Sequence, residues 1–267
     1  MLEIQDLSKS YGTGEATTHA IGHIDFSVSE SEFVSVVGPS GCGKTTLLKC
    51  MAGLLAPSTG RTMLLGRHVT RSPPEMAVVF QDYSRSLFPW LTVRRNVELP
   101  LRKKPEITQR GELVQDTLAA VGLADFADHY PWQLSGGMQQ RVAIARALAY
   151  QPKVLLMDEP FASVDAQTRG ELEDLVLSVR GRYGVTCVLV THDIDESVYM
   201  SDRVVVLTSP PSRVSETVAI DLPRPRNQVT TREHLSFGHL RGHVYQLIKG
   251  RSALPAMPGV NEELAST

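Results

Sequence analysis

The stretch SVVGPSGCGKTTLLKC, Ser35 to Cys50, predicts the fold, because three patterns follow one another around it. Val34, Val36 and Val37 form a β-branched apolar run, which predicts a short strand, and the residues after Lys44 predict a helix. The glycines between them let the backbone curl until several N–H groups point inward, where the N-terminal end of the helix also favours anions. Strand, loop and helix in this order predict a polyphosphate-binding site.

The loop and the first turn of its helix supply the candidate phosphate-binding residues: Gly38, Pro39, Ser40, Gly41, Cys42, Gly43, Lys44, Thr45 and Thr46. In such a loop the Lys44 ammonium reaches the β- and γ-phosphates, and the Thr45 hydroxyl ligates Mg²⁺. Thr46 supports the α-phosphate side. A glycine-rich turn without a ligand is the alternative, and the strand and helix on either side of the loop argue against it.

Two further apolar runs also end in polar side chains. The run 154–157 is continuous, as in a strand buried on both faces of a sheet, and it stops at Asp158 and Glu159. The run 185–190 is followed by His192. Open α/β sheets bind ligands at the carboxyl ends of their strands, so we expect Asp158 to orient Mg²⁺ and Glu159 to act as general base toward water. Two solvated acids and an incidental histidine are the alternatives.

The middle of the chain predicts a helical insert. Far more residues separate Lys44 from Asp158 than one crossover helix needs. Helical periodicity recurs over three ranges: 92–101, 111–122 and 138–149. We therefore expect an inserted α-helical subdomain over approximately residues 86–152. Gln81 stands at the seam before it, directly after an apolar run that predicts another strand.

The octapeptide LSGGMQQR, residues 134–141, is the second unusual stretch. Ser135 is a good helix cap, and the two glycines after it leave backbone N–H groups bare. This is another helix start suited to an anion, although an ordinary capped helix would explain part of the pattern. Two phosphate-facing elements in one chain suggest a site shared between two copies.

Composition limits the remaining classes. The chain has 267 residues and a net charge of −2, so it can form a sizeable core and we expect no nucleic-acid partner. The acidic N-terminus predicts no signal peptide, and no apolar run approaches the length of a membrane span. The 3 cysteines are isolated, which favours reduced thiols in a cytosolic protein.

With these motifs in this order, residues Leu2 to Asp221 resemble the nucleotide-binding subunit of an ATP-binding cassette (ABC) transporter. The resemblance identifies residues 38–45 as the Walker A loop, Gln81 as the Q-loop glutamine, 134–141 as the signature peptide, 154–159 as the Walker B strand, 163–167 as the D-loop and His192 as the switch histidine. It implies a P-loop α/β fold with a parallel-sheet core, an N-terminal antiparallel β portion and the inserted helical subdomain. The ATPase domain would then span residues 1–222. Residues 223–267 would be a short C-terminal extension, helical over 231–249 and then flexible.

The resemblance also implies how the site works. Two copies pair head to tail, and each ATP lies between the Walker A loop of one copy and the signature residues of the other: Ser135, Gly136, Gly137 and Gln139. Glu159, His192 and Gln81 take part in hydrolysis, and Thr45, Gln81 and Asp158 hold Mg²⁺. Tyr11 would stack on adenine. Asp165 would join the two sites across the dimer, and it also reads as the N-cap of the following helix.

A single cassette needs other chains to form a transport pathway. Leu87, Phe88 and Trp90 form an aromatic, apolar cluster beside Gln81, and we expect it to be exposed and to contact a permease. Packing of this cluster inside the helical insert is the alternative. The segment 81–97, with LPRPR at 222–226, resembles importer ATPases for nitrate, sulfonate and taurine.

Such an importer implies integral permease subunits, an extracytoplasmic solute-binding protein and a peripheral position of this chain on the cytoplasmic face of the inner or plasma membrane. The alternative function is a soluble ABC ATPase of a non-transport assembly, such as one for iron–sulfur clusters.

Overall fold

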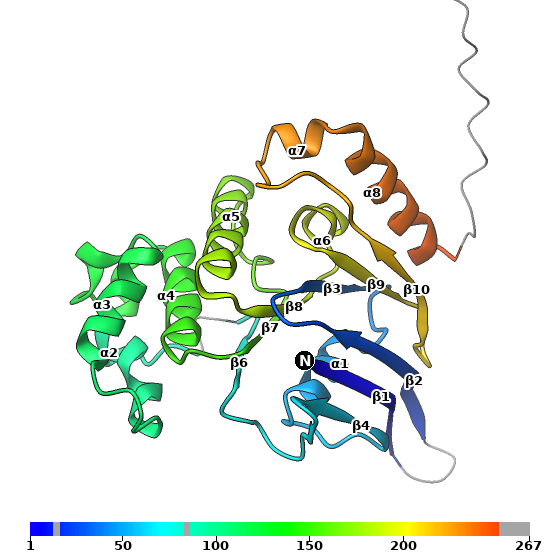
Figure 1. Ribbon diagram of the computed structural model, residues 1–267, viewed down its shortest axis with the longest axis horizontal. Helices are drawn as coiled ribbons and strands as arrows, with labels where there is room; N and C mark the ends of the chain where they lie inside the picture. Colours follow the sequence, from blue (N-terminus) through cyan, green and yellow to red (C-terminus); the bar gives the residue numbers. More distant parts are fainter. Residues whose placement is uncertain (13–16, 83–85, 251–267) are drawn as a thin grey trace, which may run out of the picture.

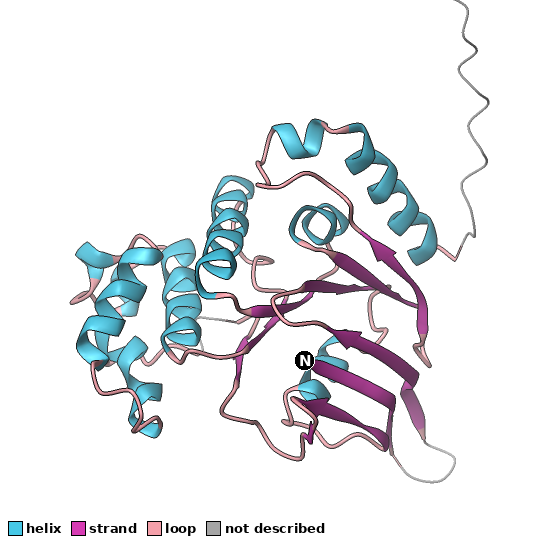
Figure 2. Ribbon diagram, viewed as in Figure 1, coloured by secondary structure: helices cyan, strands magenta, loops and turns pink. Residues whose placement is uncertain are grey.

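The computed structural model describes residues 1–12, 17–82 and 86–250, which form two sheets with helices around them (Figures 1 and 2). The larger sheet has six strands in the order β10-β9-β3-β8-β7-β6. Its strands are β3 (Phe33–Val37), β6 (Met76–Val79), β7 (Val154–Asp158), β8 (Thr186–Val190), β9 (Arg203–Leu207) and β10 (Val214–Ala219). Only the pair β9 and β10 is antiparallel among these described strands. The predicted parallel α/β core is confirmed.

The central strands β3, β7 and β8 are buried at every residue, as their apolar runs predict, and the polar Ser35 of β3 is buried with them. Alternate side chains serve two different cores because successive residues of a strand point to opposite faces. Phe33 and Val37 pack with the helical side of the molecule, whereas Val34 and Val36 pack with the second sheet. The β3 strand therefore joins the two halves of the structure and places the loop after Val37 at their junction.

The second sheet is antiparallel, with the order β2-β1-β4-β5. Its strands are β1 (Leu2–Tyr11), β2 (Thr18–Val28), β4 (Thr59–Leu64) and β5 (Arg67–His68). Leu47 and Leu48 of α1 (Lys44–Met51) belong to the same buried cluster as this sheet. The predicted N-terminal antiparallel portion is confirmed, and it fixes the helix that follows the phosphate-binding loop.

The helical subdomain lies at the left of Figures 1 and 2. It contains α2 (Val93–Glu98), the 3-10 helix Leu99–Lys103, α3 (Arg110–Ala120), the short 3-10 turns Ala124–Phe126 and Pro131–Gln133, and α4 (Gly136–Ala149). The single helix predicted over 92–101 is instead split after Glu98. Pro100 lacks an N–H group and cannot continue the α-helical hydrogen-bond pattern, so the chain tightens into 3-10 geometry.

The remaining helices are α5 (Ala166–Tyr183), α6 (Ile194–Met200), α7 (Thr230–Glu233) and α8 (Leu235–Ile248). Of these, α5 contacts α4 and α6, and α8 packs on β9 and β10. The helix predicted over 231–249 is interrupted at His234, whose ring nitrogen caps α8. Phe237 and Val244 of α8 are buried in the main core, so the segment after residue 222 packs on the α/β core itself. The flexible end predicted after this helix lies outside the described residues. None of the described helices is long and apolar enough to cross a membrane.

Candidate nucleotide-binding site

The loop after β3 has the curled backbone that the sequence predicts. Gly41 and Gly43 adopt left-handed φ values of 75° and 89°, which glycine tolerates without a Cβ clash. A Cβ on Gly43 would also lie 3.2 Å from the Ala20 carbonyl oxygen. The Cys42 side chain is fully buried, and this burial raises the pKa of its thiol. Cys42 therefore contributes its backbone to the loop and its side chain to the core.

A cavity of about 480 Å³ opens above this loop. It is lined by Ser40, Gly41, Gly43, Lys44, Thr45, Thr46, Glu159 and His192. The ends of β7 and β8 therefore converge on the loop, as we expect for polar groups at the carboxyl ends of neighbouring parallel strands. Lys44 is 7% exposed, and its Nζ donates to the carbonyl oxygens of Gly38 at 3.0 Å and Pro39 at 3.2 Å. This buried ammonium at the start of α1 suits a polyphosphate.

Oxygen donors suited to Mg²⁺ lie together beside the loop. The Thr45 hydroxyl donates to Asp158 Oδ1 at 3.1 Å, and Asp158 is 6% exposed at the end of β7. Burial raises the pKa of Asp158, and the hydrogen bond from Thr45 opposes this rise. A hydroxyl and a carboxylate are ligands that Mg²⁺ prefers, so this pair fits the predicted ion. The third predicted ligand, Gln81, lies against Glu159 instead, with its Nε2 3.4 Å from Glu159 Oε2.

Glu159 is held in an uncommon backbone conformation. Its φ is 45°, and its N–H donates to the Val190 carbonyl oxygen at 2.8 Å, which ties the end of β7 to the end of β8. Non-glycine residues with positive φ are uncommon and cluster at functional sites. His192 Nδ1 lies 3.1 Å from Glu159 Oε2. The two strand-end groups that the sequence predicts to act together are therefore in direct contact.

Tyr11 lies at the rim of the same region. It ends β1, is 44% exposed, and its hydroxyl is 3.4 Å from the Thr46 hydroxyl in the first turn of α1. An exposed ring in this position is available to a base attached to a phosphate group in the loop. Its role in stacking on adenine stays a prediction.

The signature residues begin α4 in the helical subdomain. The Ser135 hydroxyl accepts a hydrogen bond from the Met138 N–H at 3.3 Å, which confirms the predicted cap. The Gln139 amide donates to the carbonyl oxygens of Pro131 at 3.0 Å and Leu134 at 3.3 Å, so it fixes the turn before the helix. Among the described residues, no signature residue lines the cavity at Lys44. Their role toward the ATP of a second copy stays a prediction.

Asp165 begins α5 close to the signature helix. Its carboxylate accepts a hydrogen bond from the Thr168 N–H at 3.0 Å, and such hydrogen bonds lower the pKa of this carboxyl. The predicted N-cap role is therefore confirmed. Because the side chain is exposed, it also remains open to a partner, and its role across a dimer stays a prediction.

The predicted permease-contacting cluster is only partly exposed. Trp90 is 70% exposed, but Leu87 is only 3% exposed. The prediction that Leu87 belongs to an exposed cluster was therefore wrong. The Asn96 side chain accepts from the Phe88 N–H at 2.8 Å and donates to the Phe88 carbonyl oxygen at 3.1 Å. These bonds fold the segment back on α2, and Leu87 belongs to the same buried cluster as Val93 of that helix.

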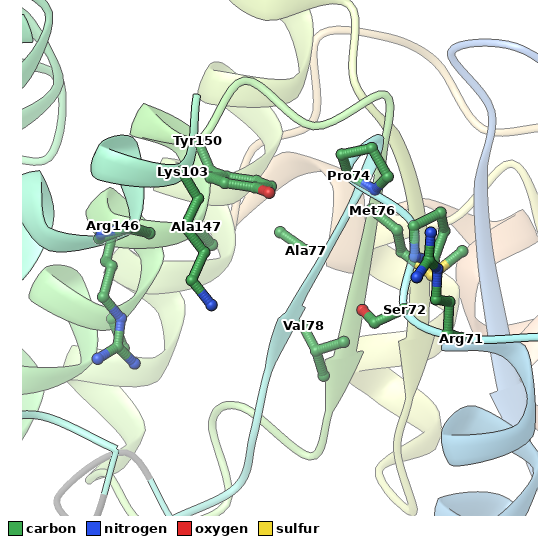
Figure 3. A pocket seen from close by; sticks show the side chains of 13 residues that line it. Arg71, Ser72, Pro74, Met76, Ala77, Val78, Lys103, Arg146, Ala147 and Tyr150 are labelled. Atoms are coloured by element: carbon green, nitrogen blue, oxygen red, sulfur yellow. The ribbon is translucent and has the colours of Figure 1, made fainter. Parts of the chain in front are cut away.

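Sequence reasoning missed a groove of about 550 Å³ between β6 and α4 (Figure 3). Ala77 and Val78 of β6 form one wall, and Ala147 and Tyr150 at the end of α4 form the opposite one. Cationic side chains also line the groove: Arg71, Lys103 and Arg146. Burial lowers the pKa of Arg146. The groove combines three distant segments, so no local pattern could have indicated it.

The fold and the site define a P-loop nucleotide-binding protein with a helical subdomain inserted in its α/β core. The family model described as ABC transporter matches residues 21–162. A solved dimeric ATP-binding cassette bound to ADP and Pi is 33% identical, with a TM-score of 0.72, covering 82% of this chain and 99% of that chain.

Proteins of similar sequence also support membership of this family. An uncharacterized ABC transporter ATP-binding protein of Methanocaldococcus jannaschii is 46% identical over 93% of this chain and 91% of its own length. The nitrate import ATP-binding protein NrtC of Synechocystis sp. is 43% identical over 91% of this chain, and the bicarbonate transport ATP-binding protein CmpC of Synechococcus elongatus is 44% identical over 90%. The chain spans 37% of the length of these last two relatives. The chain belongs to the ABC transporter family and is an ATP-binding cassette ATPase.

Proposed function

We propose that the chain is the ATP-binding and ATP-hydrolysing subunit of an ABC importer for a small solute, of the nitrate, sulfonate or taurine type. The observation that carries the proposal is the convergence of Lys44, Glu159 and His192 on one cavity beside the Thr45 and Asp158 pair. The similarity of this chain to nitrate import and bicarbonate transport ATP-binding proteins supports an importer.

The residues of the cavity divide the work of hydrolysis. Loop N–H groups and the Lys44 ammonium bind the triphosphate. Thr45 and Asp158 would hold Mg²⁺, which neutralises charge on the phosphate oxygens when bound. Glu159 holds the attacking water through Oε2 and takes its proton, while His192, in contact with the same oxygen, reaches the γ-phosphate.

A second copy completes each site in this proposal. The exposed start of α4 presents the signature residues, and Asp165 starts the neighbouring helix. In a head-to-tail homodimer these groups meet the ATP held by the Walker A loop of the other copy. ATP then acts as part of the interface, so the strength of pairing depends on it.

The groove between β6 and α4 is the proposed docking site for a cytoplasmic helix of the permease. Its walls are apolar, and Arg71, Lys103 and Arg146 give it positive charge, so the fitting partner is an apolar helix that carries an acidic residue. The 3-10 helix Leu99–Lys103 separates this groove from a second hollow, which contains Phe88 and exposed Trp90. Phe88 and Trp90, two residues of the predicted cluster, therefore remain in the proposed contact surface.

The remaining members of such a system follow from its architecture. We place this chain at the cytoplasmic face of the inner or plasma membrane, as a peripheral subunit of a complex with two permease subunits. An extracytoplasmic solute-binding protein would deliver the solute. Selectivity would then reside in those other chains, so nitrate, bicarbonate and related solutes all suit this ATPase.

Co-purification from native membranes tests the proposal. The tagged chain is solubilised in mild detergent with Trp90→Ala and Lys103→Glu variants in parallel, and captured proteins are identified by mass spectrometry. Trp132→Ala is the matched control, because Trp132 is also 70% exposed but lies outside both hollows. We expect a polytopic permease with the wild type and the control, and its loss from the two variants. Capture of only soluble factors, such as iron–sulfur assembly proteins, would reject the importer and leave the ATPase intact.

A further inference from the structure

A small cavity adjoins the proposed hydrolytic residues. Its volume is about 40 Å³, and Glu159 and His192 line it. Other polar residues that line it include Arg169, Thr191 and Glu196. A cavity of this size and polarity has room for at least one water molecule. The last three residues have no part in the hydrolytic scheme above, and two of them have unusual surroundings.

Arg169 links the starts of two helices. Its backbone N–H donates to the Asp165 carbonyl oxygen at 2.9 Å in the first turn of α5, and its Nη1 donates to Asp193 Oδ2 at 3.1 Å. Asp193 directly follows His192 and caps α6. Arg169 Nε is buried and has no hydrogen-bond partner among the described residues. Because a buried N–H without a partner is costly, a water in the adjoining cavity is its expected partner.

Glu196 is a buried acid on the first turn of α6. It is 4% exposed, and its N–H donates to Asp193 Oδ1 at 3.1 Å. Burial raises the pKa of Glu196 to about 8, and Glu173 of α5 and Asp193 raise it as well, whereas the Thr191 hydroxyl and Arg169 lower it. Glu173 is itself paired with Arg232 of α7 at 2.9 Å. This raised pKa favours the protonated form of Glu196 near neutral pH.

We propose that Arg169 and Glu196 are positioning residues which, with water in this cavity, hold the turn 191–193 so that His192 stays against Glu159. This inference rests on the proposed function, because it gives His192 and Glu159 their hydrolytic roles. A protonated Glu196 can donate a hydrogen bond within the cavity. An ionised Glu196 adds negative charge beside Asp193 and Glu159, which loosens the turn. Arg169 is bonded to Asp165 and to Asp193, so a second copy that contacts Asp165 would also affect the position of His192.

The first test compares two ion pairs that end on α6. Arg169→Gln removes the link to Asp193, and Arg241→Gln is the matched control, because Arg241 Nε lies 2.7 Å from Asp195 Oδ1 on the same helix and neither residue lines the cavity. We expect Arg169→Gln to lower kcat by roughly 10- to 100-fold, as a small misplacement of catalytic groups does, with ATP affinity unchanged. Arg169→Lys keeps the charge but lacks Nε and should give an intermediate kcat. Arg241→Gln should match the wild type.

The second test measures how kcat depends on pH. A merely structural role of Glu196 would not change this dependence. The kcat of the wild type should decline as pH rises through about 8, and Glu196→Gln, which mimics the protonated acid, should keep its kcat. The folded pKa of Glu196 lies above its ordinary value of 4.5, so the wild type should also lose thermal stability as pH rises toward about 8, and Glu196→Gln should not.

Either of two results would overturn the inference: an unchanged kcat in Arg169→Gln, or an alkaline decline that is the same in Glu196→Gln as in the wild type. Thermal unfolding of each variant identifies one that fails to fold, and in that case Arg169→Lys decides. If the wild type itself hydrolyses no ATP, the proposed function fails. If it hydrolyses ATP and the variants match it, only the positioning role fails.

Discussion

Gly137 provides a test of how closely the signature helix packs against α5. A methyl group at this position would overlap Thr168 Cγ2, and Thr168 is a β-branched residue with few rotamers in a helix. Overpacking of this kind costs about 1–3 kcal/mol, and replacement of glycine by alanine in a helix returns up to about 1 kcal/mol. If that full gain applies, Gly137→Ala should destabilise the chain by up to about 2 kcal/mol, which is a fall of up to roughly 8 °C in Tm for a chain of this size.

Two further variants isolate the cause of that loss. Thr168→Ser removes the overlapping methyl and keeps the hydroxyl, so the double variant Gly137→Ala/Thr168→Ser should regain most of the lost Tm. Gly111 also stands second in its helix, but a Cβ there meets no atom within 4 Å, so Gly111→Ala should be neutral or stabilising. Thermal unfolding followed by circular dichroism measures all four chains. Equal Tm values for Gly137→Ala and Gly111→Ala, or no recovery in the double variant, would refute the packing argument.

Three other changes test the site and the fold. Glu159→Gln should still bind ATP but hydrolyse it about 100- to 10,000-fold more slowly, because it removes the general base, and wild-type turnover would contradict this role. Lys44→Ala should weaken ATP binding itself, which titration with a fluorescent nucleotide measures, and unchanged affinity would exclude its contact with the phosphates. Leu65 has a φ of 51° at an exposed turn before Gly66, so Leu65→Asn should raise stability by about 0.5–1 kcal/mol in thermal unfolding, and a loss would show that the leucine packs usefully.

Local pattern predicted the elements that carry the chemistry. The buried strands that lead to Gly38, Asp158 and His192 are rich in apolar residues. Their polar ends meet because parallel neighbours place their carboxyl ends at one edge of the sheet. The helix caps at Ser135 and Asp165 were also evident, because the hydroxyl and the carboxylate satisfy N–H groups within three residues.

Features that depend on tertiary contacts were not predictable in this way. Leu87 looks exposed beside Trp90, but the side chain of Asn96 turns it inward through bonds to Phe88. The groove at β6 and the cavity at Arg169 each combine segments far apart in the sequence. From sequence alone, Glu196 on a short helix cannot be told from a solvated acid, because its burial depends on its neighbours in the fold.

In the proposed mechanism, two copies of this chain share each ATP. Sedimentation of Glu159→Gln, in which bound ATP should persist, tests it most directly. With ATP and Mg²⁺ we expect a two-chain species that ADP does not support and that an added Ser135→Arg change abolishes. The same mass with and without ATP, or a dimer that survives Ser135→Arg, would contradict it.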